Sequence, residues 1–152
     1  MNNKKCFILM AAPGAGKSTL AKQLAKDNNA VICSADDFHV WWGNGVYNWS
    51  ASRQKYAHDF CKYLFLQAIS LGKNVIVDNT NTKLSDMRPY INISKENGYQ
   101  LLFIEPETSW KYNAEECFKR NTHNVPLETI ERMINQIQNT KELKEFQELC
   151  LT

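Results

Sequence analysis

The sequence has no long apolar run, no cysteines at metal-binding spacing and little net charge. No run approaches the roughly 18 consecutive apolar residues that a membrane-spanning helix needs. The five cysteines are an odd number without Cys-x-x-Cys spacing, which argues against a disulfide framework and a zinc site and favours a reducing cytoplasm. Eighteen basic and sixteen acidic side chains leave a charge of +2, so any contact with nucleic acid must be local.

Internal repeats, low-complexity tracts and composition shifts typical of linkers are also absent. The chain has 152 residues, of which 43% are hydrophobic, and this is enough to build one core. We therefore predict a single domain over residues 1–152.

The order of apolar runs and helical patterns predicts an α/β fold. Four nearly continuous apolar runs are typical of parallel strands that are covered on both faces, and they span Lys5–Met10, Ala30–Cys33, Asn74–Val77 and Gln100–Ile104. Helical periodicity falls in Lys17–Lys26, Arg53–Leu71, Ser85–Asn97, a segment that starts at Pro126, and Lys141–Leu149. The pattern predicts a four-stranded parallel sheet flanked by helices.

A glycine-rich segment follows the first predicted strand and opens the first predicted helix. It reads Ala11-Ala12-Pro13-Gly14-Ala15-Gly16-Lys17-Ser18-Thr19, the context that a phosphate-binding P-loop demands. The segment from Ala12 to Thr19 would surround the phosphates of ATP with its backbone N–H groups, which every residue but Pro13 supplies, with Lys17 neutralising the outer phosphates and Ser18 binding Mg²⁺. Ala11 replaces the first glycine of the usual pattern. The alternative is a chance glycine-rich turn.

Carboxylates follow three of the predicted strands, at the sheet edge where ligands of open parallel sheets bind. Asp36 is the predicted general base for an acceptor hydroxyl, and Asp78 the predicted second ligand of Mg²⁺. Asp37, Asn79 and Asn81 are predicted to bind the acceptor. The alternative for Asp36 and Asp37 is that one of them only caps the following helix.

A basic segment at residues 113–124 resembles a mobile lid. Arg120 is the residue we expect over the transferring phosphoryl group, where it would be both catalytic and ATP-binding. Asn113 and Glu116 suit a helix start with reciprocal capping, which favours a structural role for Glu116. The alternative for Arg120 is an exposed surface residue.

Aromatic residues crowd the segment directly after the aspartate pair. They are Trp41, Trp42, Tyr47 and Trp49, around a loop from Gly43 to Gly45. Such side chains beside a catalytic carboxylate could stack on a base of the acceptor, and Trp41 is the predicted substrate-binding residue among them. The alternative is that these rings only pack the loop.

Taken together, these segments resemble the phage-type polynucleotide 5′-kinase group of P-loop proteins, and the AAA-type ATPase branch related to the kinase-like region of NEDD-binding proteins. The resemblance runs from about residue 5 to 137 and includes stretches such as 76–81, Glu105-Pro106, Trp110, Arg120-Asn121 and Val125-Pro126. It implies a P-loop NTPase sandwich in which the strand ending at Asp78 neighbours the strand that leads into the loop. It also implies the roles given above for Lys17, Ser18, Asp36 and Arg120.

The expected function is an ATP- and Mg²⁺-dependent kinase that phosphorylates a 5′-hydroxyl of a polynucleotide or nucleotide. His39 stands where phage-type polynucleotide kinases have an acceptor-side arginine, so the acceptor stays open. Two alternatives remain: a kinase for a small alcohol such as a sugar, an antibiotic or a nucleotide-sugar, and an ATP-binding module with little catalysis. The expected partners are a nucleoside triphosphate and a single-stranded nucleic-acid end or small alcohol.

Overall fold

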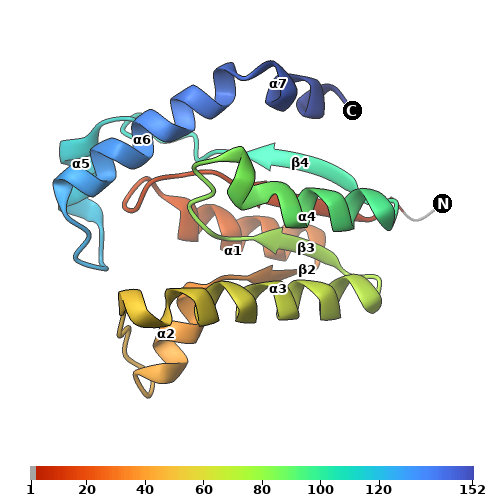
Figure 1. Cartoon of the computed structure of the whole chain (residues 1–152), viewed down its shortest axis with the longest axis horizontal. Coiled ribbons are helices and arrows are strands. Elements are labelled where there is room, and N and C mark those ends of the chain that lie inside the picture. Colours follow the sequence, from red (N-terminus) through yellow and green to blue (C-terminus); the bar gives the residue numbers. More distant parts are fainter. Residues whose placement is uncertain (1–2) are drawn as a thin grey trace.

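The computed structural model describes residues 3–152 and contains one parallel sheet with the strand order β2-β3-β1-β4 (Figure 1). The strands are β1 (Lys5–Leu9), β2 (Ala30–Cys33), β3 (Asn74–Val77) and β4 (Gln100–Ile104). The helices are α1 (Lys17–Asn28), α2 (Asp36–Trp42), α3 (Gln54–Ser70), α4 (Leu84–Glu96), α5 (Ala114–Arg120), α6 (Leu127–Glu142) and α7 (Lys144–Leu151), with a 3₁₀ turn at Ala51–Arg53. The predicted four-stranded parallel α/β fold is confirmed.

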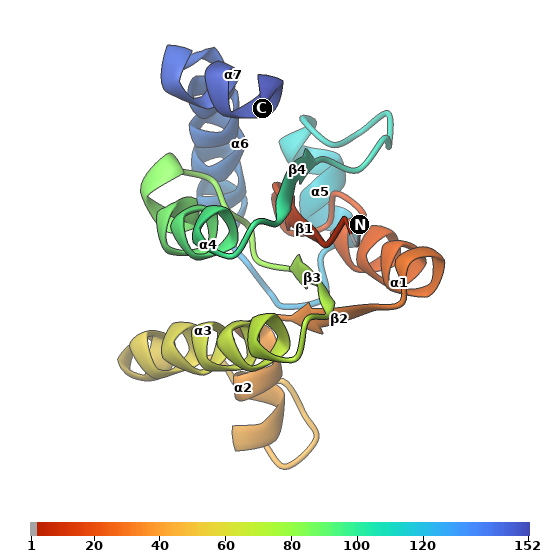
Figure 2. The same ribbon diagram turned by 90° about the vertical axis from the view of Figure 1, so that its right-hand side faces the viewer.

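Helices cover both faces of the sheet, which gives three layers (Figure 2). Cys6 and Ile8 of β1 face the core shared with α3, α4, α6 and α7, whereas Phe7 and Leu9 face α1. Successive residues of a strand point to opposite faces, so a central strand covered on both sides must be apolar throughout. This explains the continuous apolar runs of the sequence.

The carboxyl ends of the four strands lie at one edge of the sheet, on the left in Figure 1. β3 pairs directly with β1, as the family resemblance implied, and Cys6, Phe7 and Ile8 stand opposite Val75, Ile76 and Val77. The loop after β1 and the residues after β3 therefore leave the sheet side by side. A main-chain hydrogen bond of 3.0 Å from Ala11 N–H to the Thr80 carbonyl joins them.

The C-terminal helices differ from the prediction. We predicted a last helix over Lys141–Leu149, but α6 continues to Glu142 and α7 begins at Lys144. Ile137 and Thr140 continue the buried face of α6, and the chain leaves the helical conformation only at Leu143, whose ψ is 130°. Within residues 3–152 no helix combines the length and apolarity that crossing a membrane requires.

Candidate active site

The phosphate loop leaves its amide groups free at the start of α1. Gly16 occupies the N-cap position with a φ of 104° and provides no side chain to cap the helix. The indole of Trp110 donates to the Gly14 carbonyl (3.0 Å), and the hydroxyl of Thr108 donates to the Ala15 carbonyl (2.8 Å). These bonds hold the carbonyls, while the first-turn N–H groups of α1 have no intrahelical partner and suit an anion.

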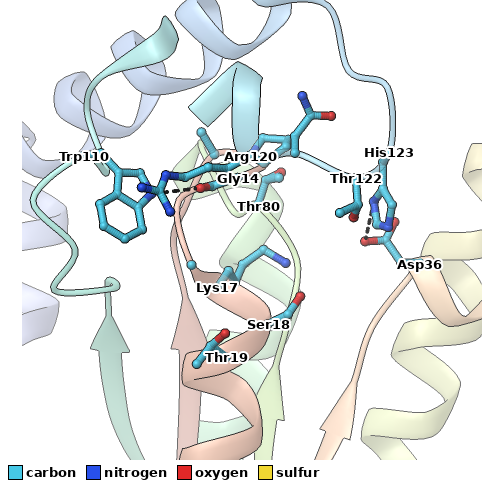
Figure 3. A pocket seen from close by; sticks show the side chains of 14 residues that line it. Gly14, Lys17, Ser18, Thr19, Asp36, Thr80, Trp110, Arg120, Thr122 and His123 are labelled. Atoms are coloured by element: carbon cyan, nitrogen blue, oxygen red, sulfur yellow. Dashed lines mark hydrogen bonds and ion pairs between the residues drawn. The ribbon is translucent and has the colours of Figure 1, made fainter. Parts of the chain in front are cut away.

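A cavity of about 360 Å³ lies over this loop (Figure 3). It is lined by Ala12, Pro13, Gly14, Gly16, Lys17, Ser18, Thr19, Asp36, Thr80, Trp110, Arg120, Asn121, Thr122 and His123. The structure thus brings the predicted loop residues to one cavity together with Asp36 and Arg120. Ala15, which was also predicted to bind ATP, is fully buried beneath the loop.

Lys17 is paired with Asp78 across the floor of the site. Its ammonium group donates to a carboxylate oxygen of Asp78 at 2.7 Å, and both side chains are largely buried. Asp36 and Asp37 lie nearby in the first turn of α2. Burial raises the pKa of Asp37, and the charges of Asp78 and Asp36 raise it further. The site therefore concentrates negative charge, which a cation would offset.

These residues fit a magnesium ion that is shared with bound phosphates. Ser18 lines the cavity, whereas Asp78 and Asp37 do not line it themselves; Asp78 reaches it through its ion pair with Lys17, and Asp37 lies close enough to Asp78 to feel its charge. Among residues 3–152, no three metal-ligating side chains of the His, Cys, Asp or Glu type come close enough to hold an ion by themselves. Mg²⁺ in phosphoryl-transfer sites uses one or two protein ligands and completes its shell with phosphates and water. The donor set is compatible with that arrangement.

Arg120 reaches the cavity from the end of α5. Its guanidinium group lies 3.7 Å from the centre of the Trp110 ring, and its Nε donates to a carboxylate oxygen of Glu116 at 3.1 Å. Asn113 caps α5 by accepting from the Glu116 N–H, but the Glu116 carboxylate pairs with Arg120, so the predicted capping is one-sided. Arg120 is therefore half-exposed, but Trp110 and Glu116 hold its guanidinium group in one position. An ordinary surface arginine would need neither contact.

Asp36 faces the cavity from its opposite side (Figure 3). Tyr47 donates its hydroxyl to one oxygen of Asp36 (3.4 Å), and Nδ1 of His123 lies 3.8 Å from the other. The Tyr47 and His123 rings stack with their centres 3.8 Å apart. Burial and the nearby Asp36 raise the pKa of Tyr47, so its hydroxyl stays a donor. The capping alternative is not observed, because α2 has no side-chain cap and the Asp36 N–H donates to Ser34 Oγ.

The other predicted substrate residues are spread more widely. Trp41 is 70% exposed at the end of α2 and does not line the cavity, and this exposure disfavours the alternative that it only packs the loop. Asn79 accepts from the Ala35 N–H (2.9 Å), and the buried Asn81 donates to the Leu9 carbonyl (2.6 Å). Both amides therefore fix the main chain at the ends of β1 and β2. Acceptor binding by these residues stays a prediction.

No role was predicted for Trp110, although its identity was part of the family resemblance. It also did not predict that Tyr47 and His123 meet at Asp36. Both contacts join residues from loops that are far apart in the chain, 96 positions for Trp110 and Gly14 and 76 for the two rings. Neither contact leaves a periodic signal in the sequence.

Comparison with known proteins identifies the family. The sequence profile of an AAA domain matches residues 7–140. The chain belongs to this AAA domain family. NEDD4-binding protein 2 of Homo sapiens is 38% identical over 136 residues, which are 86% of this chain and 7% of that protein. The predicted resemblance to NEDD-binding proteins is confirmed.

Two further matches extend the comparison. The 2′,3′-cyclic-nucleotide 3′-phosphodiesterase of Rattus norvegicus is 24% identical over 132 residues, or 86% of this chain and 30% of that protein. A chain in the structure of the Pnkp1/Rnl/Hen1 RNA repair complex has a TM-score of 0.75 and 25% identity, covering 93% of this chain and 46% of that one. The chain therefore spans less than half the length of each of these relatives. What they share is a P-loop domain of kinase-like fold.

Proposed function

We propose that this P-loop domain transfers the γ-phosphoryl group of ATP to a 5′-hydroxyl of a polynucleotide or nucleotide. The observation that carries the proposal is that one cavity is lined by Lys17, Asp36 and Arg120. A kinase needs a phosphate-binding loop, a base for the acceptor and a cation over the transferring group, and these three residues supply those parts. The similarity to a chain of an RNA repair complex supports a nucleic-acid end as the acceptor.

On the phosphate side, the N–H groups of residues 12, 14 and 16–19, which line the cavity, and the ammonium group of Lys17 bind the β- and γ-phosphates. Lys17 exchanges its bond with Asp78 for a bond with phosphate, because an ammonium group has three donors and can turn toward the cavity. Arg120 enters from α5 and neutralises charge on the transferring group. Ser18 and Asp78 would hold Mg²⁺, which would neutralise charge on the β- and γ-phosphates.

On the acceptor side, a carboxylate oxygen of Asp36 takes the proton of the attacking hydroxyl. The hydroxyl oxygen forms a bond to the γ-phosphorus as the bond between that phosphorus and the oxygen bridging to ADP breaks. The Tyr47 hydroxyl holds one carboxylate oxygen and so fixes the orientation of the base. Asp36 remains 42% exposed, so solvent and an incoming hydroxyl have access to it.

A labelled-phosphate assay tests the proposal. The purified chain is incubated with γ-labelled ATP and Mg²⁺ against 5′-hydroxyl DNA, 5′-hydroxyl RNA and a panel of small alcohols, with Lys17→Ala as the inactive control. Label on an oligonucleotide supports the proposal. Label only on a small alcohol would show that the acceptor is that alcohol and not a nucleic-acid end. Tight ATP binding without transfer to any acceptor would show that the domain is a nucleotide-binding module.

We also propose that residues 1–152 fold as one unit and work in a reducing cytoplasm. The three hydrophobic clusters of the described chain all pack on the one sheet or on the loop that leaves it. All five cysteines are free thiols, and four of them are buried. A single cooperative unfolding transition would support the first point. For the second point, a fusion of the chain to a fluorescent protein should be found in the cytoplasm, and secretion of the fusion would contradict it.

A further inference from the structure

A second cavity of about 430 Å³ adjoins the phosphate cavity on the far side of His123. We call it the aromatic groove, and it is lined by Gly43, Val46, Tyr47, Asn48, Trp49, His123 and Asn124. His123 lines both cavities, and its ring is stacked on Tyr47. The Tyr47–His123 stack therefore forms the boundary between the two spaces. Because both rings also contact Asp36, the groove ends beside the proposed base.

The wall of the groove is held in place by many polar contacts. A Cβ on Gly43 would lie 1.8 Å from the Val46 carbonyl oxygen, so only glycine permits the tight return of the chain after α2. Arg53 donates to the carbonyl and the side-chain oxygen of Asn48 (2.9 and 3.1 Å). The indole of Trp49 donates to Gln54 Oε1 at 3.0 Å, which fixes the ring. Stable walls and an open interior are the properties of a binding site that exists before its ligand arrives.

The chemistry of the lining suits a flat, neutral, aromatic ligand. Among residues 3–152, no carboxylate, ammonium or guanidinium group lines the groove, and its titratable lining groups are Tyr47 and His123. Trp49 is 53% exposed, so a face of its ring is available for stacking. Asn48 and Asn124 add amide groups that can form hydrogen bonds with ring nitrogens and carbonyls. A nucleobase matches these aromatic faces and amides, whereas the adjacent guanidinium group of Arg53 is not part of the lining and is already bonded to Asn48.

We propose that the aromatic groove binds the nucleobase next to the 5′-hydroxyl that is phosphorylated, with Trp49 as its stacking platform. The inference rests on the proposed function and adds a substrate requirement to it: the acceptor must carry a base. A base held in the groove places the attached sugar at the Tyr47–His123 boundary, where the hydroxyl meets Asp36. This position is favoured over Trp41, which lines neither cavity.

The test compares a 5′-hydroxyl oligonucleotide with the same oligonucleotide lacking its first base. We expect the wild-type KM to be about 10-fold higher for the abasic acceptor, since a stacked base contributes substantially to single-strand binding. Trp49→Ala should raise the KM of the intact acceptor to that of the abasic one and leave the abasic KM unchanged. Trp49→Phe should keep most of the preference for the intact acceptor. Tyr63→Ala removes an exposed ring of α3, away from the groove, and should keep all of that preference.

Each failure has a distinct meaning in this design. Equal KM values for the two acceptors with the wild-type protein, or a preference that survives Trp49→Ala, would overturn the assignment of the groove while leaving the kinase proposal standing. A preference abolished by Trp41→Ala alone would move the base site to the end of α2 and overturn the assignment as well. Absence of transfer to either acceptor would instead overturn the proposed function. MgATP affinity, measured for every variant, shows that Trp49→Ala has folded.

Discussion

Trp110 connects the phosphate loop to the lid arginine, and this connection gives a quantitative prediction. Its ring lies under the guanidinium group of Arg120, and its indole N–H holds the Gly14 carbonyl. Trp110→Leu removes both contacts. Trp110→Phe removes only the hydrogen bond and keeps an aromatic face for the arginine.

The expected losses follow from the two contacts. The hydrogen bond at 3.0 Å contributes about 1 kcal/mol, which is the usual net value. A cation–π contact with a half-exposed arginine contributes about 1 kcal/mol as well. Trp110→Phe should therefore lower kcat/KM for ATP about 5-fold, and Trp110→Leu about 30-fold, since 1.4 kcal/mol corresponds to a factor of ten.

The assay is phosphoryl transfer to a 5′-hydroxyl oligonucleotide with the two Trp110 variants, Arg120→Ala and the double variant Trp110→Leu/Arg120→Ala. Because the ring acts partly through Arg120, the double variant should lose about 1 kcal/mol less than the sum of the single variants. Phe118→Leu serves as the control and should leave the rate unchanged, because Phe118 is an exposed residue of α5, the helix that carries Arg120. Strictly additive losses, or equal losses for Trp110→Phe and Trp110→Leu, would refute the positioning role of the ring.

Three further predictions concern the loop and the core. Lys17→Ala should abolish tight MgATP binding in calorimetry and also lower the free energy of unfolding by about 2 kcal/mol, because it leaves the largely buried Asp78 without its cation; wild-type stability would contradict the importance of the pair. Gly14→Ala should destabilise the chain by about 2 kcal/mol in denaturant unfolding, since φ is 83° and a Cβ would lie 2.0 Å from a main-chain oxygen of α5. Gly98→Ala, with positive φ but open space, should cost less, and equal costs would remove the clash from the explanation. At pH 8 a thiol reagent should label only Cys150 in the folded chain, because the other four thiols are buried; rapid labelling of a second thiol would show that the described core opens.

Much of the fold was predictable because its signals are local. The ends of β2, β3 and β4 agree with the predicted ranges, since strands covered on both faces must be apolar throughout. The phosphate loop was predictable from its residue pattern and from its place between a predicted strand and a predicted helix. The end of α6 was not, because Lys141 was predicted to begin the last amphipathic helix, whereas it belongs to α6 and is bonded to Glu105, the residue after β4 (2.6 Å).

The candidate site was predictable as a set of residues but not as a set of contacts. The strand ends identified the carboxylates, but nothing local indicated that Asp78 pairs with Lys17, 61 positions away. The aromatic loop after α2 was recognised, and substrate binding by the ring chosen from the sequence, Trp41, stays a prediction; Trp41 lines neither of the two cavities described above, whereas Tyr47 and Trp49 line one. Which ring meets the site depends on how the loop turns at Gly43, where main-chain hydrogen bonds return Val46 to Gly43 and Asn48 to His39.

The most direct test of the account is phosphoryl transfer by Asp36→Asn. Asparagine keeps the size of the side chain and can still accept from Tyr47, but it cannot take the proton of an acceptor hydroxyl. We expect MgATP affinity to stay at the wild-type value while the rate of transfer falls about 100-fold or more. Turnover equal to that of the wild-type protein would contradict the central claim that Asp36 is the base at this phosphate loop.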